Sequence, residues 1–324
     1  MPDQRTTVVH VLDDYQDVAR TYVDWSASPH DLDVHVFHDH LADAVALQER
    51  HRVADVLVVM RERTPLPAEL LARLPRLRLV VTTGARNSVV DVDAAAARGI
   101  TVCGTRILTS PAVELTWGLI LAALRDIPDQ HARMRQGLWQ NTVGGGVEGR
   151  HLGVVGLGAI GARVARVAHA FGMEVLAWSP NLTAARAGEL GVHAVGKEEL
   201  CRRADVVSIH LRLSDSTRGV IGESELRAMD DTWLVNTSRA EIVDQQSLLR
   251  ALHEGWIAGL ATDVYDTEPP LAHHPLRHAP RTVLTPHIGY VTTQNYELFY
   301  QDALEAVTRF LAGDPVRVVA PSAS

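Results

Sequence analysis

A chain of 324 residues is long for one compact domain, so two domains are the better expectation. The net charge of −8 and the lack of a basic stripe argue against a nucleic-acid partner. The two cysteines, Cys103 and Cys201, lie far apart, which excludes a disulfide framework and a paired-cysteine metal site. No apolar run approaches the roughly 18 residues of a membrane helix, and the N-terminus has no signal-like apolar stretch. We therefore expect a cytoplasmic protein with no membrane partner.

Short apolar runs alternate with helical patterns, which is typical of parallel α/β architecture. The first third predicts strands at 7–12, 33–37, 56–60, 77–83 and 100–104 and helices at 67–72 and 91–98. A longer helix is expected over 110–126, with Ser110 as its N-cap, Pro111 in its first turn and Pro128 as its stop.

The same alternation continues after a glycine-rich loop at 143–149. Further strands are expected at 152–155, 174–178, 192–195, 204–211, 232–238, 257–265 and 282–289. A second α/β layer system therefore starts near residue 106 and ends at about 290. An amphipathic helix over 293–312 is left to join the first domain or the hinge.

A glycine motif, G-x-G-x-x-G, stands between the strand at 152–155 and a helix that runs to about Phe171. Its glycines are Gly156, Gly158 and Gly161, and a second strand follows, as in a dinucleotide-binding βαβ unit. This context favours a nucleotide site over a purely structural turn. The second strand ends at Ser179, where an Asp or Glu would bond the ribose hydroxyls of NAD.

Charged side chains follow three later strands. Arg239 could bind a carboxylate through a bidentate hydrogen bond, although an ordinary surface ion pair explains an arginine at this position equally well. Asp263, Glu268 and His287 could each be an ordinary loop residue. Together they suggest a general acid/base, because a carboxylate facing one ring nitrogen of a histidine orients the ring and raises its pKa from about 6.5.

The histidines, sixteen in number, also raise the question of a metal. The candidates are His35, His38 and His40 and the pair His273–His274. No HExxH pattern or cysteine partner accompanies them. We favour exposed histidines in a His-rich composition and predict no metal site.

Six motifs in order make the chain similar to the D-isomer-specific 2-hydroxyacid dehydrogenase family over essentially its full length. They are ELTWGLILAALRDIP, G-x-G-x-x-G, ADVVSIHL, NTSRAEIVD, DVYDTEP and TPHIG. The resemblance implies two Rossmann-like or flavodoxin-like parallel-sheet domains of class α/β, with a cleft between them. The implied dinucleotide-binding domain spans 106–291, and the implied substrate domain is discontinuous, 1–105 plus 292–324.

The resemblance also implies the chemistry, a reversible hydride transfer between NAD(P)H and a small 2-keto or 2-hydroxy acid. Arg239 would hold the substrate carboxylate, His287 would protonate the carbonyl oxygen, and Glu268 would keep His287 protonated and oriented. Asp263 would orient the nicotinamide carboxamide. The implied cofactor-binding residues are Gly156, Gly158, Ala159, Ile160, Gly161, Ser179, His210, Leu211, Arg212, Thr237, Ser238, Asp263 and Gly289.

Substrate contacts are implied for Arg61, Gly84 and Ala85, besides Arg239 and His287. The helix at 110–126 commonly pairs subunits in this family, so a homodimer is expected through the dinucleotide-binding domain. The chain departs from the usual pattern at Arg212, Ala240 and Tyr290 and in the loop TTGARN. Polar residues at Arg61, Arg63, Arg86, Asn87 and Tyr290 suggest a small or anionic 2-keto acid such as glyoxylate or hydroxypyruvate.

Ser179 bears on which dinucleotide binds. A small hydroxyl does not repel a 2′-phosphate, and Arg212 could pair with that phosphate through a charge-assisted hydrogen bond of roughly 1.5–3 kcal/mol. Alternatively Ser179 simply caps the turn and NAD binds through its pyrophosphate. We favour NADP slightly over NAD.

Other activities remain as alternatives. A phosphite dehydrogenase could use the same three residues, and a non-catalytic NAD(H)-sensing protein related to transcriptional corepressors could also retain them. Glu268 argues against a formate dehydrogenase, which carries Gln at that position. A long-form phosphoglycerate dehydrogenase is less favoured, because the chain ends near residue 324 without a regulatory domain.

Overall fold

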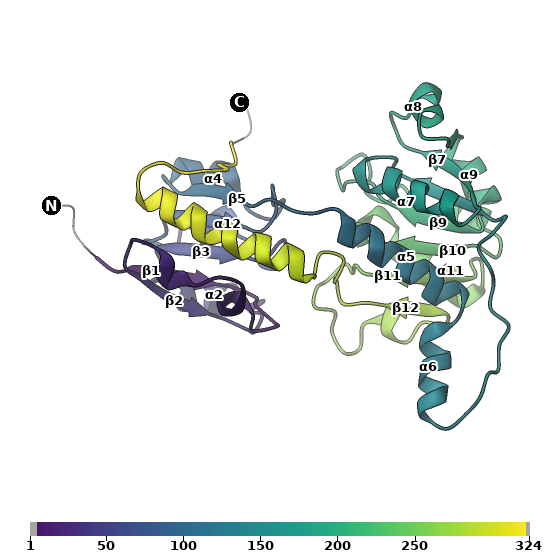
Figure 1. Cartoon of the computed structure of the whole chain (residues 1–324), viewed down its shortest axis with the longest axis horizontal. Helices are drawn as coiled ribbons and strands as arrows, with labels where there is room; N and C mark the ends of the chain where they lie inside the picture. Colours follow the sequence, from purple (N-terminus) through teal and green to yellow (C-terminus); the bar gives the residue numbers. More distant parts are fainter. Residues whose placement is uncertain (1–4, 322–324) are drawn as a thin grey trace. The chain divides into compact units, whose positions relative to one another are not determined.

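The computed structural model describes residues 5–321, and the chain divides into two units (Figure 1). Unit 1 consists of Met1–Leu108 and Thr292–Ser324, and unit 2 of Thr109–Val291. The first division therefore falls after Leu108, slightly beyond the expected boundary at residue 105. The C-terminal helix groups with the N-terminal segment, so unit 1 is discontinuous in sequence.

Unit 1 is built on a parallel sheet of five strands in the order β2-β1-β3-β4-β5, which is the flavodoxin-like order. Valine-rich runs form its central strands, and these are buried on both faces, as parallel strands usually are. The strands are β1 (Thr7–Val11), β2 (Leu32–Val36), β3 (Val56–Val59), β4 (Leu79–Thr82) and β5 (Thr101–Gly104).

The longest helix of unit 1 is α12 (Thr293–Leu311), which contacts β4 and α1. Its buried stripe includes Phe299, Tyr300, Ala303 and Val307, a spacing of three and four residues that places them on one face. The shorter helical segments are α1 (Ala19–Tyr22), η1 (Trp25–Ala27), α2 (Ala44–His51), α3 (Ala68–Leu71) and α4 (Val92–Ala97).

Unit 2 has a parallel sheet of seven strands in the order β12-β11-β10-β9-β6-β7-β8. Counted from β6 this is the Rossmann order 3-2-1-4-5-6 with one further strand. The strand order reverses between β6 and β9, because β7 and β8 lie on one side of β6 and β9 to β12 on the other. The strands are β6 (His151–Val155), β7 (Glu174–Trp178), β8 (His193–Ala194), β9 (Val206–Ile209), β10 (Trp233–Asn236), β11 (Gly259–Thr262) and β12 (Thr282–Leu284).

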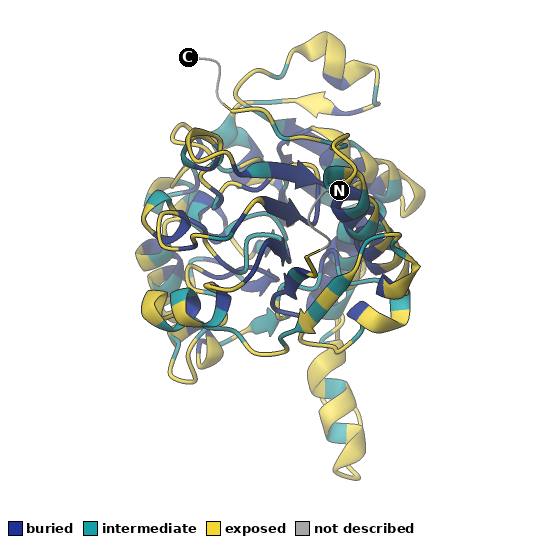
Figure 2. Cartoon of the chain, turned by 90° about the vertical axis from the view of Figure 1, so that its left-hand side faces the viewer, coloured by how far each residue is buried: buried dark blue, intermediate teal, exposed yellow. Residues whose placement is uncertain are grey.

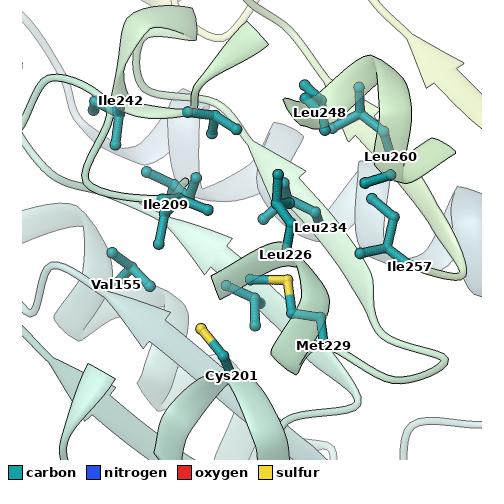
Figure 3. Packing of buried hydrophobic residues seen from close by; sticks show 14 of the residues in the cluster. Val155, Cys201, Ile209, Leu226, Met229, Leu234, Ile242, Leu248, Ile257 and Leu260 are labelled. Atoms are coloured by element: carbon teal, nitrogen blue, oxygen red, sulfur yellow. The ribbon is translucent and has the colours of Figure 1, made fainter. Parts of the chain in front are cut away.

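Alternate strand residues of unit 2 face opposite sides of its sheet and enter two separate cores. Leu234 and Leu260 join the core beneath α9 (Lys197–Arg203), α10 (Glu223–Ala228) and α11 (Gln245–Glu254), part of which Figure 3 shows. Their neighbours Val235 and Ala261 join the core beneath α5 (Ser110–Leu124) and α7 (Ala159–Ala170). The remaining short helical segments are α8 (Ala184–Gly188), η2 (Ala240–Ile242) and η3 (Pro275–Arg277).

The long helix expected over 110–126 differs from the structure at both ends. Thr109, not Ser110, is the N-cap of α5, and α5 ends at Leu124. Pro128 does not stop a helix but lies in the first turn of a new one, α6 (Ile127–Arg135), after Asp126 turns the chain in the left-handed region. Proline suits a first turn, where its missing N–H costs no helical bond. Helix α6 has no buried residue and projects from unit 2 as the exposed helix at the bottom of Figure 2.

Four predicted strands are too long at their carboxyl ends. The strands end at Ile209, Asn236, Thr262 and Leu284, whereas the predictions extended to 211, 238, 265 and 289. The apolar pattern continues past these points, but the backbone leaves the sheet and turns. The residues beyond these four ends include most of the predicted site.

Among the residues that the structure describes, no helix is both long enough and apolar enough to span a lipid bilayer.

Candidate active site

The predicted site residues of unit 2 follow the carboxyl ends of neighbouring strands. Pairing in register brings these ends to one edge of the sheet, which is where open α/β sheets bind ligands. The residues that end the strands, in sheet order, are Leu284, Thr262, Asn236, Ile209, Val155 and Trp178.

The glycine motif forms the tight turn between β6 and α7. At Gly156 φ is 104°, and a Cβ atom there would lie 2.7 Å from the backbone carbon of His210. At Gly161 a Cβ atom would lie 2.1 Å from the carbonyl oxygen of Gly156. Both positions therefore require glycine for close backbone packing.

Gly158 is different, because a Cβ atom there would meet nothing within 4 Å. It is the N-cap of α7, and no side chain caps this helix end. Ala159, Ile160 and Gly161 form the first turn, whose N–H groups and dipole suit a phosphate. The open space at Gly158 beside an uncapped helix N-terminus fits a dinucleotide pyrophosphate.

Ser179 lies directly after β7 and binds the glycine turn. Its Oγ accepts the amide N–H of Leu157 at 2.9 Å, which leaves the hydroxyl hydrogen available to donate elsewhere. The side chain thus has a structural partner and is still half-buried rather than enclosed.

The loop after β9 contains His210, Leu211 and Arg212. His210 binds Ser208 through Nε2 at 2.9 Å, and burial lowers its pKa to about 4, so the ring is neutral near pH 7. The Leu211 carbonyl oxygen accepts the hydroxyl of Ser238, which joins this loop to the one after β10. Arg212 is exposed, and no carboxylate among residues 5–321 pairs with its guanidinium.

The loop after β10 positions Arg239 through Asn236. The Asn236 amide donates to the Arg239 carbonyl at 2.9 Å, and its oxygen accepts the N–H of Ser238 at 3.0 Å. The guanidinium of half-buried Arg239 donates to the Ser238 carbonyl at 2.6 Å. The hydroxyl of Thr237, the residue before Ser238, lies 2.8 Å from the hydroxyl of Thr116 on α5.

Glu268 and His287 are in direct contact. Nδ1 of His287 lies 2.5 Å from Oε2 of Glu268, and the other carboxylate oxygen accepts the N–H of Tyr265 at 2.9 Å. Because a carboxylate only accepts, Nδ1 carries the hydrogen, and Nε2 has no hydrogen-bond partner among the described residues. The two side chains are 23% and 29% exposed, so a ligand can reach the imidazole.

Asp263 holds the loop that carries His287. One oxygen accepts the Thr285 hydroxyl at 2.6 Å and the N–H of Ile288 at 2.8 Å, and the other accepts the N–H of Gly289 at 2.8 Å. Burial raises the pKa of Asp263, against these hydrogen bonds, which lower it. His287 has a φ of 52°, a left-handed conformation that the bonds on either side of it keep in place.

In unit 1 the predicted substrate residues lie next to one another. The guanidinium of Arg61 donates to the Thr83 carbonyl at 3.1 Å and lies against Gly84, where a Cβ atom would come within 1.9 Å of it. Ala85 is exposed, whereas Asn87 is buried and binds the Arg61 carbonyl at 2.6 Å. Asn87 therefore supports the fold of this loop rather than presenting its amide as a ligand contact.

Several histidines have protein partners. His35 and His274 each contact a carboxylate, Asp33 at 3.0 Å and Asp266 at 2.7 Å. In the described part of the chain, Asp14, Asp17 and His38 place potential metal ligands within 4.8 Å of one another. Asp17 and His38 are exposed, which is common without an ion, and neither belongs to the predicted site.

Residues 117–289, all in unit 2, match the D-isomer specific 2-hydroxyacid dehydrogenase, NAD binding domain. The chain belongs to the D-isomer specific 2-hydroxyacid dehydrogenase family.

Known relatives of this dehydrogenase include a glyoxylate reductase of Aeropyrum pernix, 39% identical over 82% of this chain and 83% of that protein. A D-3-phosphoglycerate dehydrogenase of Methanocaldococcus jannaschii is 35% identical over 83% of this chain but 52% of its own length. Among solved structures, the phosphoglycerate oxidoreductase from Vibrio cholerae superposes with a TM-score of 0.90 at 39% identity, covering 95% of this chain and 100% of that one.

Family membership confirms the resemblance and the two-sheet α/β fold predicted from the sequence. The protein is a D-2-hydroxyacid dehydrogenase, an oxidoreductase with an NAD-binding domain that acts on small 2-hydroxy or 2-keto acids.

Sequence reasoning missed three residues of the dehydrogenase that hold its site together. Asn236 and Thr285 stand inside the motifs NTSRA and TPHIG, just before Arg239 and His287, and this position was the available signal. Tyr265 likewise stands inside a motif, DVYDTEP, between Asp263 and Glu268. Its hydroxyl binds the carbonyl of Thr285, which lies 20 residues further along the chain.

Proposed function

We propose that this dehydrogenase reduces a small 2-keto acid to the D-2-hydroxy acid, with Arg239, Glu268 and His287 as its catalytic residues. The observation that carries the proposal is the 2.5 Å contact between His287 Nδ1 and Glu268 Oε2. It occurs at the same sheet edge as the glycine turn and Arg239. A histidine oriented by a carboxylate, with its other nitrogen accessible, is the arrangement of a general acid/base.

His287 delivers a proton from Nε2 to the carbonyl oxygen in the reductive direction and recovers it in the oxidative one. The hydride for the carbonyl carbon is supplied by a reduced nicotinamide when the cofactor is bound. Glu268 stabilises the protonated imidazole and orients the ring. Arg239 binds the substrate carboxylate, because a guanidinium has the opposite charge and can form two parallel hydrogen bonds with the two carboxylate oxygens.

For the substrate we propose glyoxylate or hydroxypyruvate. The names of the relatives, glyoxylate reductase and D-3-phosphoglycerate dehydrogenase, support the class of 2-keto and 2-hydroxy acids, and polar residues in the loops support a small anionic molecule. From unit 1 we propose that Arg61 and the backbone of Gly84 and Ala85 contact it. The observation that supports these contacts is that the Arg61 guanidinium lies directly against Gly84.

For the cofactor we propose NADP over NAD. Ser179 places no carboxylate at the end of β7, and its hydroxyl keeps one hydrogen to donate. Only β6 separates β7 from β9, so the ends of these two strands lie roughly 10 Å apart at about 4.8 Å per strand. Ser179 directly follows one end, and Arg212 comes three residues after the other. An arginine side chain crosses most of that distance, and Arg212 has no carboxylate partner among residues 5–321.

We propose further that two copies pair through unit 2. The support is α6 and the following loop, which expose Met134, Trp139 and Val143. A hollow of about 450 Å³ lies along α6, lined by Arg125, Ile127, Gln130, His131 and Met134. Light scattering on the purified chain tests the pairing, and a monomeric mass at micromolar concentration would contradict it.

The deciding experiment is turnover by the purified protein of a panel of 2-keto acids with NADPH and with NADH. We expect glyoxylate or hydroxypyruvate to be reduced, and faster with NADPH at equal subsaturating concentration. Phosphite with NAD and NADP belongs in the same panel. Turnover of phosphite alone would replace the proposed substrate class, and binding of dinucleotide without any turnover would favour a sensing protein.

A further inference from the structure

Glu268 and His287 are held by hydrogen bonds that form a closed ring of four residues. The N–H of Tyr265 donates to Glu268 Oε1 at 2.9 Å, and Glu268 Oε2 accepts from His287 Nδ1 at 2.5 Å. The N–H of His287 donates to the Thr285 carbonyl at 3.1 Å. That same carbonyl accepts the hydroxyl of Tyr265 at 3.0 Å, which closes the ring.

Tyr265 provides a second link between the segment after β11 and the segment after β12, beside the Glu268–His287 contact. Its backbone follows β11 and precedes Glu268, whereas its side chain reaches the segment after β12 that carries His287. The ring of Tyr265 is buried, at 8% exposure, so the hydroxyl has a fixed direction. The bond from the Tyr265 hydroxyl to the Thr285 carbonyl therefore connects the segment of Glu268, the acceptor of the pair, to the segment of His287, the donor.

We propose that the hydroxyl of Tyr265 is a positioning group that sets the distance and angle of the His287–Glu268 pair through the Thr285 carbonyl. This inference rests on the proposed function of that pair. Tyr265 contacts neither the glycine turn nor Arg239 through any hydrogen bond of the described residues, so it acts on the proton-transfer step and not on binding. Burial raises the pKa of Tyr265 to about 12, which keeps the hydroxyl a donor at the pH of the assay.

The variant Tyr265→Phe removes the hydroxyl and keeps the ring. Thr285 still accepts the N–H of His287, so no buried carbonyl loses its last partner and the variant is expected to fold. We expect kcat to fall on the order of fivefold to tenfold, with KM and the dissociation constant of the dinucleotide unchanged. A rise in KM without a fall in kcat would overturn the proposal.

Thr232→Val is the matched control. Thr232 is also buried, and its hydroxyl also donates to a backbone carbonyl, that of Ala204, at 2.7 Å. It precedes β10, at the opposite edge of the sheet from the site. If the loss of one buried hydroxyl lowers kcat equally in both variants, Tyr265 has only a structural role.

A double-mutant cycle with Glu268→Gln tests whether Tyr265 acts through the pair. We expect Tyr265→Phe to lower kcat by a much smaller factor in the Glu268→Gln background than in the wild type. In that background the geometry of the His287–Glu268 pair, which Tyr265 maintains, is already lost. Full additivity of the two losses would overturn the proposal.

A readout without turnover separates this inference from the proposed function. In ¹⁵N-histidine-labelled protein, the His287 ring signals, assigned with His287→Gln, should shift in Tyr265→Phe and stay in place in Thr232→Val. Unchanged His287 signals in Tyr265→Phe would overturn the positioning role, even in an active enzyme. Absence of turnover in the wild type would instead overturn the proposed function.

Discussion

Nδ1 of His287 lies 2.5 Å from Oε2 of Glu268. This contact assigns the hydrogen to Nδ1 and leaves Nε2, on the other side of the ring, to exchange a proton with a ligand. Because the two residues come from segments after different strands, β11 and β12, their contact depends on the pairing of those strands.

Replacement of His287 by Ala should lower kcat by about 10²–10⁴-fold, since the proton donor that we propose is lost. The dissociation constant for NADPH, measured by fluorescence titration, should stay within about twofold, because His287 follows β12, and three strands separate β12 from β6, which precedes the glycine turn. His253→Ala, at an exposed position of α11, is the control for loss of a histidine. Turnover at the wild-type rate in His287→Ala would remove this residue from the mechanism.

Two glycines of the same turn should respond in opposite ways to Ala. Gly161→Ala places a Cβ atom 2.1 Å from the Gly156 carbonyl and should destabilise the fold by about 1–3 kcal/mol, seen as a lower Tm. Gly158→Ala meets no atom within 4 Å, so Tm should not change. It should nevertheless weaken dinucleotide binding, because the methyl group points into the space that we assign to the pyrophosphate. Unaltered binding by Gly158→Ala would contradict that assignment.

Cofactor preference should depend on Arg212 and Ser179. Arg212→Ala should raise KM for NADPH by about 10- to 100-fold, the equivalent of one charge-assisted hydrogen bond, and leave KM for NADH unchanged. Ser179→Asp should shift preference toward NADH, since a carboxylate repels the 2′-phosphate and can bond the ribose hydroxyls. Arg218→Ala, an exposed cation in the same loop, serves as the control. A wild-type enzyme that prefers NADH would refute the role of Arg212.

A buried histidine pair in unit 1 should make stability depend on pH. Nδ1 of His10 lies 2.9 Å from Nδ1 of His51. Burial, and then the neighbouring His35, lower the pKa of His10 to about 4; burial, and then His10, lower that of His51 to about 3.

Both rings are neutral in the folded and unfolded states above about pH 7.5, one unit above the unfolded pKa, so they contribute no pH dependence there. Below pH 6.5 the unfolded chain binds protons that the folded chain does not, so stability falls as the pH drops toward 4. The slope should approach roughly 1 kcal/mol per pH unit for each ring. Thermal unfolding between pH 7 and 5 measures it. His51→Gln should flatten the curve, and His193→Gln, at an exposed position of β8, should not; equal slopes in all three proteins would refute the assignment.

The chain order of the elements could be predicted from the sequence, because apolar periodicity and glycine or proline positions are local signals. The strands that the pattern indicated are present, and the glycine motif lies between a strand and a helix as expected. The errors were local as well. The sequence predicts Pro128 as a helix stop, although proline also favours a helix start, and only the turn at Asp126 distinguishes the two.

The candidate site shows what the sequence could not supply. Residue types and motif order indicated Arg239, Glu268 and His287 and the family to which the chain belongs. Which atoms touch was decided by tertiary structure: Ser179 with Leu157, Asp263 with the loop around His287, and Tyr265 with Thr285. The physical reason is that a motif encodes local backbone and side-chain chemistry, whereas a hydrogen bond between distant segments exists only after parallel strands align their carboxyl ends at one edge.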